Sequence, residues 1–189
     1  KVLNASDYGV PQDRNRLFLI GCRNGLTLPE YPEPITRGIN RHIDHGDLPN
    51  CPTCEEALGD LPDAEGFSQL NDVDCLRGVE FGTSSPYAKE LRCLSNDGWH
   101  FGYPRVWDPE LLTSSLRTNH TEISRRRFRE TEPGTVEPIS RFFKLAPDGI
   151  SNTLRAGTDS ARGAFTSPRP IHYKYPRCVT VREMARLHG

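Results

Sequence analysis

The chain has 189 residues, of which 24 are basic, 25 are acidic and 35% are apolar. Its 16 glycines and 16 prolines favour a mixed, loop-rich fold over a helical bundle. No apolar run is long enough to cross a membrane and no signal peptide is visible, so we expect no membrane association. The six cysteines at scattered spacings then predict reduced thiols and a cytoplasmic protein.

The two halves of the chain carry opposite net charge. Residues 1–100 hold 9 basic and 16 acidic groups, a net of −7, whereas residues 101–189 hold 15 basic and 9 acidic groups, a net of +6. Arginine supplies 20 of the basic residues, and its planar guanidinium binds phosphate and stacks on bases. The bias favours nucleic-acid recognition; genome composition or a salt-bridged surface is the alternative explanation.

The first recognisable element begins with a Gly-Val-Pro turn at 9–11. Gln12, Arg14 and Arg16 follow at alternate positions, and the chain continues into an apolar run that predicts a buried strand over 16–22. In an extended segment these three side chains share one side. One amide and two guanidinium groups on one face suit a site for phosphate or for the polar edge of a base.

The middle of the chain contains many helix-breaking residues and one helix-capping pattern. Repeated prolines predict an extended connector over 28–52. A capping-box pattern begins at Thr53, which predicts a short helix through about Leu58 that ends near Gly59. Residues 63–105 are rich in Asp, Ser and Gly, and we expect irregular structure there.

The second half contains three predicted helix starts. Residues 108–110 read Asp-Pro-Glu, an N-cap residue followed by proline at the first helical position. A helix is predicted over about 119–129, and a further capping box at Thr180 predicts a helix over 181–187. Short apolar runs separated by turns favour small strands over 140–176.

Four possible metal ligands lie close together in the sequence. His42, His45, Cys51 and Cys54 form a His-x2-His-x5-Cys-x2-Cys pattern, and these residue types bind zinc. Cys54 also falls in the first turn of the capped helix, where a small buried thiol packs well. Ordinary thiol burial is therefore the main interpretation, and structural zinc is the alternative.

Two regions are candidates for contacts to phosphates or bases. Arginine occupies positions 125, 126, 127 and 129 of one predicted helix and cannot point one way, so Arg126 is a candidate within an otherwise solvated face. A second region combines small residues, which allow close backbone approach, with Thr and Arg. Its candidates are Thr153, Leu154, Arg155, Gly157, Arg162 and Gly163.

The sequence contains no recognisable covalent-catalysis site. None of the six cysteines lies in a setting that would activate a nucleophile. Neither a Gly-x-Gly-x-x-Gly loop nor a Walker loop is present to hold a nucleotide. We therefore expect this chain by itself to be catalytically incomplete.

Long motifs near both ends resemble one enzyme family. The segment Tyr8-Gly9-Val10-Pro11-Gln12-x-Arg14-x-Arg16 closely resembles the eighth motif of cytosine-C5 DNA methyltransferases, and residues 176–187 resemble their ninth. Thr153-Leu154 resembles the Thr-Leu pair of their target recognition domain. Arg169-Pro170-Ile171-His172 also resembles bacterial members just before the ninth motif.

This resemblance implies an α/β fold, the end of a doubly wound, Rossmann-like methyltransferase sheet plus a smaller, irregular α+β target recognition domain. It divides the chain into the last part of the catalytic domain (1–24), a connector and the start of the recognition region (25–105), the target recognition domain (106–176) and the ninth-motif helix (177–189). The family's Pro-Cys-Gln nucleophile motif and its glycine-rich S-adenosylmethionine loop are absent from this sequence. We therefore expect a C-terminal fragment that is inactive alone.

The family's mechanism assigns roles to the motif residues. A cysteine thiolate attacks C6 of a cytosine flipped from the duplex, and S-adenosylmethionine supplies a methyl group to C5. By resemblance, Arg16 reaches the flipped base, while Arg14 and Gln12 organise the pocket; alternatively, the two arginines pair with carboxylates of the absent half. Arg182 and Glu183 are expected to be structural.

The implied partners are double-stranded DNA, an N-terminal catalytic half and, in a bacterial cell, a cognate restriction endonuclease. Three other interpretations stay open. A related branch of the family methylates tRNA, and the eighth motif alone does not exclude it. The chain could instead be a non-catalytic DNA-binding or accessory module, or a zinc-stabilised interaction domain.

Overall fold

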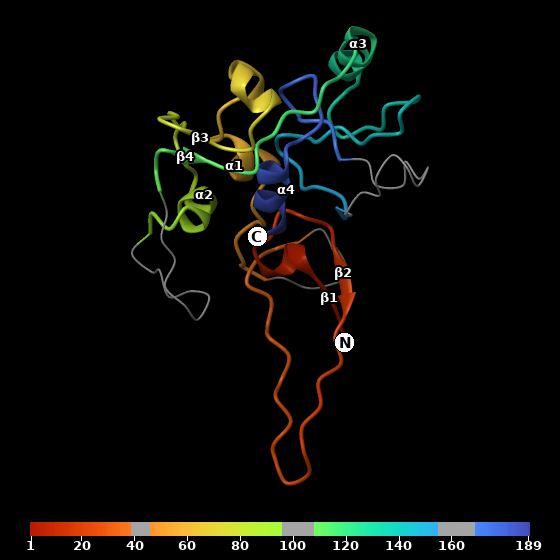
Figure 1. The fold of residues 1–189 in the computed structure, drawn as a ribbon. Coiled ribbons are helices and arrows are strands. Elements are labelled where there is room, and N and C mark those ends of the chain that lie inside the picture. Colours follow the sequence, from red (N-terminus) through yellow and green to blue (C-terminus); the bar gives the residue numbers. More distant parts are fainter. Residues whose placement is uncertain (39–45, 96–107, 155–168) are drawn as a thin grey trace.

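The structure is a computed structural model that describes residues 1–38, 46–95, 108–154 and 169–189. A body that holds the helices lies above a small antiparallel ribbon, and a long arm projects from that ribbon away from the body (Figure 1). The C-terminal helix lies in the middle of the molecule, between ribbon and body. None of the helices in the described ranges has the length and apolar character needed to cross a bilayer.

The ribbon consists of β1 (Val2–Asn4) and β2 (Asn15–Leu17), which pair antiparallel and flank the 3-10 helix η1 (Ala5–Tyr8). The prediction of a buried strand over 16–22 is wrong in both length and burial. All three residues of β2 are exposed, and the ladder joins only three residue pairs. Among the described residues, no second layer of structure covers the apolar run, which therefore stays at the surface.

We define the apolar arm as residues 17–35. Leu19 is 86% exposed and Leu17 is 65% exposed. The base of the arm is fastened by the Tyr31 hydroxyl, which donates to the Phe18 carbonyl at 2.9 Å, and by the Tyr8 hydroxyl, which donates to the Pro32 carbonyl at 3.0 Å. The exposed large apolar side chains of the arm are Leu17, Phe18, Leu19, Leu26, Leu28 and Ile35.

The predicted capping boxes are confirmed. Helix α1 (Cys54–Leu58) begins at Thr53, whose hydroxyl accepts from the Glu56 amide at 3.2 Å while the Glu56 carboxylate accepts from the Thr53 amide at 2.8 Å. Helix α4 (Val181–His188) has the same reciprocal cap at Thr180 and runs one residue beyond the prediction. The two helices pack against each other.

Within the predicted irregular region 63–105, the described residues 63–95 are more regular than predicted. Besides η2 (Ala64–Gly66) and η3 (Ser68–Asn71), it contains α2 (Pro86–Leu91), which the sequence analysis missed. Ser85 caps this helix through the Ala88 amide, and Pro86 occupies its first turn. The dipeptide Ser85-Pro86 could have indicated this helix start. The similar Asp-Pro dipeptide at 108–109 led to the prediction of a helix start there, which is wrong.

The predicted helix start at 108–110 is wrong because the segment enters a sheet. A turn leads into β4 (Leu111–Leu112), which pairs antiparallel with β3 (Leu76–Arg77). The Asp108 carboxylate accepts from the Glu110 amide at 3.0 Å and from Arg77 at 2.6 Å, so its capping ability closes a turn instead of starting a helix.

The prediction for 119–129 is confirmed as α3 (Glu122–Glu130), capped by Thr121. In the described parts of 140–176 the expected strands are reduced to isolated bridges, such as Lys144 with Ile171 and Val136 with Phe143. Phe128 of α3 lies in a small core cluster with residues from these bridges.

One larger core holds the body together. It joins residues from all three predicted segments beyond residue 24, which share a single apolar interior. Predicted boundaries at 105/106 and 176/177 therefore do not separate independent cores. Its buried members are Cys54, Ala57, Leu58, Leu61, Ala64, Leu70, Val79, Leu112, Leu145, Leu154, Val179 and Leu187.

Candidate functional site

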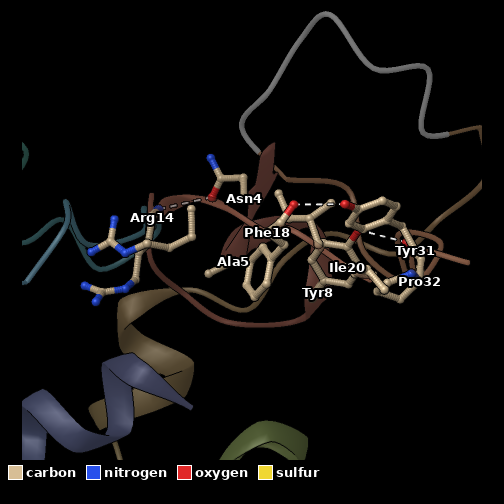
Figure 2. A pocket seen from close by; sticks show the side chains of 10 residues that line it. Asn4, Ala5, Tyr8, Arg14, Phe18, Ile20, Tyr31 and Pro32 are labelled. Atoms are coloured by element: carbon tan, nitrogen blue, oxygen red, sulfur yellow. Dashed lines mark hydrogen bonds between the residues drawn. The ribbon is translucent and has the colours of Figure 1, made fainter. Parts of the chain in front are cut away.

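A cavity of about 430 Å³ lies between the ribbon, η1 and the base of the apolar arm. Figure 2 shows the Arg14 guanidinium at one end and Tyr31 with Pro32 at the other, with Ala5, Tyr8, Phe18 and Ile20 between them. We call it the ribbon cavity. Its walls are mostly apolar, and both of its charged residues are arginines. Its lining residues are Leu3, Asn4, Ala5, Tyr8, Arg14, Arg16, Phe18, Ile20, Tyr31 and Pro32.

Arg14 is held by hydrogen bonds both at its backbone amide and at its guanidinium. Its backbone amide donates to Asn4 Oδ1 at 3.1 Å, and its guanidinium Nη1 donates to the Leu154 carbonyl at 3.1 Å. The same Nη1 lies 3.5 Å from Gln12 Oε1. The side chain is half-buried, so a cationic group is held in one place at the cavity edge.

Arg16 is held less tightly. It lies on the exposed strand β2 and donates from Nη1 to the carbonyl of its neighbour Asn15 at 2.7 Å. A guanidinium carries five N–H donors, so an exposed one has ample capacity for a ligand. The structure thus brings Arg14 and Arg16 to one cavity, as alternation predicted.

Gln12 lies beside Arg14 but is not part of the cavity lining. It is fully buried, forms a bridge with Ser151 and donates from Nε2 to the Leu187 carbonyl at 3.1 Å. Its amide thereby satisfies a carbonyl in the last turn of α4, a group that the helix itself leaves unpaired. Gln12 Oε1 lies 3.5 Å from Arg14 Nη1, so the two side chains adjoin as alternation predicts, but Gln12 itself does not line the cavity.

His188 of α4 lies beside this group, with Nδ1 3.4 Å from Gln12 Nε2. Burial, together with the positive charges of Arg14 and Arg16, lowers the pKa of His188 and favours its neutral form. The sequence analysis did not single out this residue, since nothing in a helix-end histidine indicates a distant arginine pair.

The Thr153–Leu154 pair adjoins the same segment. The Thr153 hydroxyl donates to the Asp13 carbonyl at 2.6 Å, and the Leu154 side chain is buried in the main core. The structure therefore engages the Thr153 hydroxyl inside the protein and turns the Leu154 side chain away from solvent. Arg155, Gly157, Arg162 and Gly163 lie outside the described residues.

The arginines of α3 have separate tasks. Arg125 forms a two-bonded ion pair with Glu65, and Arg127 lies 3.8 Å from a Glu137 carboxylate oxygen. Arg126 and Arg129 are exposed. Figure 1 places α3 at the far end of the body from β1 and β2, so Arg126 and the ribbon cavity belong to distant parts of the molecule.

Arg182 and Glu183 are engaged within the body. Arg182 donates to the Thr113 carbonyl at 3.2 Å, and the buried Glu183 accepts two bonds from Arg177, both at 2.8 Å. Burial alone would raise the pKa of Glu183, but the hydrogen bonds and charge of Arg177 outweigh it and hold the pKa below its usual range.

The whole chain, residues 1–189, matches the family model of the C-5 cytosine-specific DNA methylases. The chain belongs to this family. It is 55% identical over its full length to the Type II methyltransferase M.XorII of Xanthomonas oryzae pv. oryzae, of which it covers 41%. It is 26% identical to the Type II methyltransferase M.MthTI of Methanothermobacter thermautotrophicus, of which it covers 44%.

A solved structure shows the same fold. A prophage-encoded DNA modification methyltransferase from E. coli superposes with a TM-score of 0.57 at 23% identity, over 100% of this chain and 48% of the other. The chain thus spans less than half the length of these methylase relatives.

Three thiols of this methylase chain, those of Cys51, Cys54 and Cys178, are buried. Burial raises the pKa values of Cys51 and Cys54 to about 12, and the Cys51 thiol donates to the Val10 carbonyl at 3.2 Å. His42 and His45 lie outside the described residues. Across the residues that the structure describes, no three His, Cys, Asp or Glu side chains gather as metal ligands would. Structural zinc stays the alternative interpretation.

Proposed function

We propose that this chain is the DNA-recognition and cytosine-positioning part of a DNA (cytosine-5)-methyltransferase. The observation that carries the proposal is the ribbon cavity, where Arg14 and Arg16 meet apolar and aromatic walls in a member of the methylase family. A base flipped from the duplex presents polar edges and a flat apolar face. Guanidinium donors suit the edges, and the aromatic side chains suit the face.

In this proposal Arg16 supplies the donor that meets the base. Attack on the cytosine ring builds negative charge, and a guanidinium at the carbonyl oxygen stabilises that charge as it forms. Arg16 is the more exposed of the two arginines and lines the cavity. Arg14, bonded to the Leu154 carbonyl and near Gln12, orders the cavity edge.

The family uses S-adenosylmethionine as methyl donor, and the ribbon cavity does not fit that cofactor. The donor carries a positive sulfonium, whereas both charged residues of the cavity are cationic and no carboxylate lines it. We therefore assign cofactor binding and the nucleophile to another part of the protein and assign no methyl-transfer step to these residues.

The exposed apolar arm favours the existence of a separate catalytic half in the complete protein. Six large apolar side chains of the arm are exposed, a density that marks an interaction surface. Relatives are more than twice as long as this chain, since it covers 41% and 44% of them. We propose that the catalytic half of the protein covers the arm and that residues 1–24 belong to that half.

The recognition region would read the duplex through residues beyond Leu154 and through α3. An arginine bonded to a guanine edge discriminates by about 1–3 kcal/mol, so we propose that Arg155 specifies sequence. Arg162, Gly157 and Gly163 would approach the phosphates or the groove closely, as would Arg126 from its exposed helix face.

The proposal is tested by methyl transfer from labelled S-adenosylmethionine to duplex DNA and to tRNA, with the complete protein that contains this chain. Label in DNA, mapped to one cytosine of a defined sequence, supports it. Label only in tRNA would show that the methyltransferase acts on tRNA instead of DNA. DNA binding without label would favour an accessory DNA-binding role.

The relatives' names extend the proposal to its setting. The two relatives named above are both Type II methyltransferases. We therefore propose a restriction-modification role in a bacterial cytoplasm, with a cognate endonuclease as the functional counterpart. Cleavage of unmethylated host DNA in a strain that lacks the methyltransferase would support it.

A further inference from the structure

One arginine that follows the 155–168 region directly in the sequence has a guanidinium with unused donors. Arg169 is the first described residue after that region and is half-buried. Its Nη1 donates to Thr118 Oγ1 at 3.2 Å, which joins two positions that are 51 residues apart in the sequence. Thr118 is exposed. We call these two residues the Arg169–Thr118 pair.

The backbone beside each member of the pair is bonded to the interior of the body. On one side, the Pro170 carbonyl accepts from the Val179 amide at 2.9 Å. On the other side, the Arg117 amide donates to the Leu70 carbonyl at 2.8 Å. Val179 and Leu70 are both fully buried and belong to the main core. The close-packed core therefore holds both segments, and the pair lies at a fixed place on the surface.

The acidic groups near the pair are already bonded to other arginines. The charged side chains that act on His120, two residues after Thr118, are Glu65, Arg125, Arg169 and Arg177. Glu65 forms its two-bonded ion pair with Arg125, and the Asp63 carboxylate accepts from Arg177 Nε at 3.0 Å. Among the residues that the structure describes, no carboxylate lies within ion-pair distance of the Arg169 guanidinium. Arg169 therefore adds a positive charge that no described neighbour neutralises.

The remaining donors of the pair suit a ligand that only accepts hydrogen bonds. A guanidinium has five N–H donors, and Arg169 uses one of them on Thr118. Because Thr118 Oγ1 accepts from Arg169, the hydrogen of its hydroxyl is still available to donate. The oxygens of a phosphate diester accept bonds and donate none, and a guanidinium binds them through charge-assisted bonds. A cation and a hydroxyl held side by side at the surface thus have the chemistry of a phosphate site.

We propose that Arg169, together with the Thr118 hydroxyl, binds one phosphate of the DNA backbone beside the recognition region. This inference deepens the proposed function and rests on it for duplex DNA as the ligand. Backbone contacts fix the register of a protein on the duplex and carry no sequence information. Loss of the Arg169 charge therefore weakens binding to all DNA sequences alike and leaves kcat at saturating DNA unchanged.

The test measures the affinity of the complete protein for duplex DNA at several salt concentrations, without S-adenosylmethionine. Each phosphate contact contributes about 0.9 to the steepness with which log K falls against log salt. We expect Arg169→Gln to reduce the steepness by about that amount. We also expect it to weaken binding about 10- to 150-fold, the effect of one hydrogen bond to a charged group. Arg169→Lys keeps the charge and should keep the steepness.

Arg77→Gln is the matched control for net charge. It removes the same charge from an exposed arginine, whose Nη1 already lies 2.6 Å from an Asp108 carboxylate oxygen. This variant should bind DNA with the steepness of the wild type. An equal reduction in both variants would make the effect one of net charge and would overturn the inference.

Two further outcomes would contradict the phosphate contact. Wild-type steepness in Arg169→Gln would show that the guanidinium meets no phosphate. Weaker binding to the target sequence alone would make Arg169 a base contact. Should R169Q not fold, Thr118→Val leaves the arginine in place and removes one neutral donor, so binding should weaken about 2- to 12-fold at unchanged steepness. Binding by T118V as tight as that of the wild type would then count against the site.

Failure of the proposed function would be visible separately. A wild-type protein that labels neither DNA nor tRNA would contradict the proposed activity, while the salt titration of the same protein and of R169Q still decides the phosphate contact. A wild type that labels DNA, with an R169Q variant that binds DNA as the wild type does, would overturn this inference alone.

Discussion

The body and the ribbon with its arm differ in how their side chains are satisfied. In the body even charged groups are buried with partners: Asp60 accepts from Arg92 and Arg186, both at 3.1 Å, and Glu183 is bonded twice by Arg177. The arm instead exposes apolar side chains, and the ribbon presents Arg16 at its surface. The body carries its own stability, whereas the ribbon and arm have surfaces that fit a ligand and a covering partner.

Removing a partner from the buried charges should have the largest effect. Arg177→Ala leaves Glu183 buried without its cation, which costs about 3–5 kcal/mol. Denaturant unfolding of the complete protein measures the loss. Arg129→Ala, at an exposed position of α3, is the control and should change stability by less than about 0.5 kcal/mol. Equal effects of the two substitutions would contradict the contrast between buried and exposed charges.

The arm can be tested in the same assay. If a catalytic half covers Leu19 in the complete protein, Leu19→Ala destabilises it by about 2–5 kcal/mol, as for a buried leucine. Ile123→Ala is a suitable control, because Ile123 is 66% exposed on α3. A Leu19→Ala protein as stable as the wild type would mean that the arm is exposed in the complete protein too.

The cavity prediction concerns rate. Arg16→Ala removes a donor to developing charge, so methyl transfer should fall by about 100- to 1000-fold with stability little changed. Arg77→Ala, at an exposed position of β3 outside the cavity lining, is the matched control and should keep its rate. Near-normal turnover of Arg16→Ala on DNA would contradict the assignment.

The body should also lose stability on acidification through His172. Burial lowers the pKa of this histidine to about 4, while its Nδ1 accepts from the Lys174 amide at 3.0 Å. Between about pH 6.5 and 4 the unfolded chain therefore binds a proton that the folded chain does not. Its neutral form stabilises the fold at pH 7, and about 2 kcal/mol should be lost at pH 5.

Urea unfolding at the two pH values measures this loss, and His172→Gln is the comparison. The variant should show a smaller decrease in stability between pH 7 and pH 5. The lowered pKa of Glu183 acts at lower pH, because its contribution is present above the ordinary range of a glutamate and is lost as the pH falls below it. An unchanged pH dependence in His172→Gln would exclude the histidine as the source.

The sequence by itself determined the helices that begin with a capping box. Helices α1 and α4 start where Thr53 and Thr180 predict, because a cap bonds to an amide only three residues away. Helix α3 overlaps the range predicted for it. The motif pattern also identified Arg14 and Arg16, which line one cavity. Local geometry was sufficient in each case.

The tertiary structure decided what depends on distant partners. The apolar run after Arg16 looked buried, but its burial requires a covering layer that the described residues do not supply. Asp108 caps a turn because β4 finds β3 more than thirty residues earlier. Gln12 and Thr153 bond across about 140 residues or more, to Leu187 and Asp13. Such pairings reflect the closure of long loops around a shared core, and no short sequence pattern encodes them.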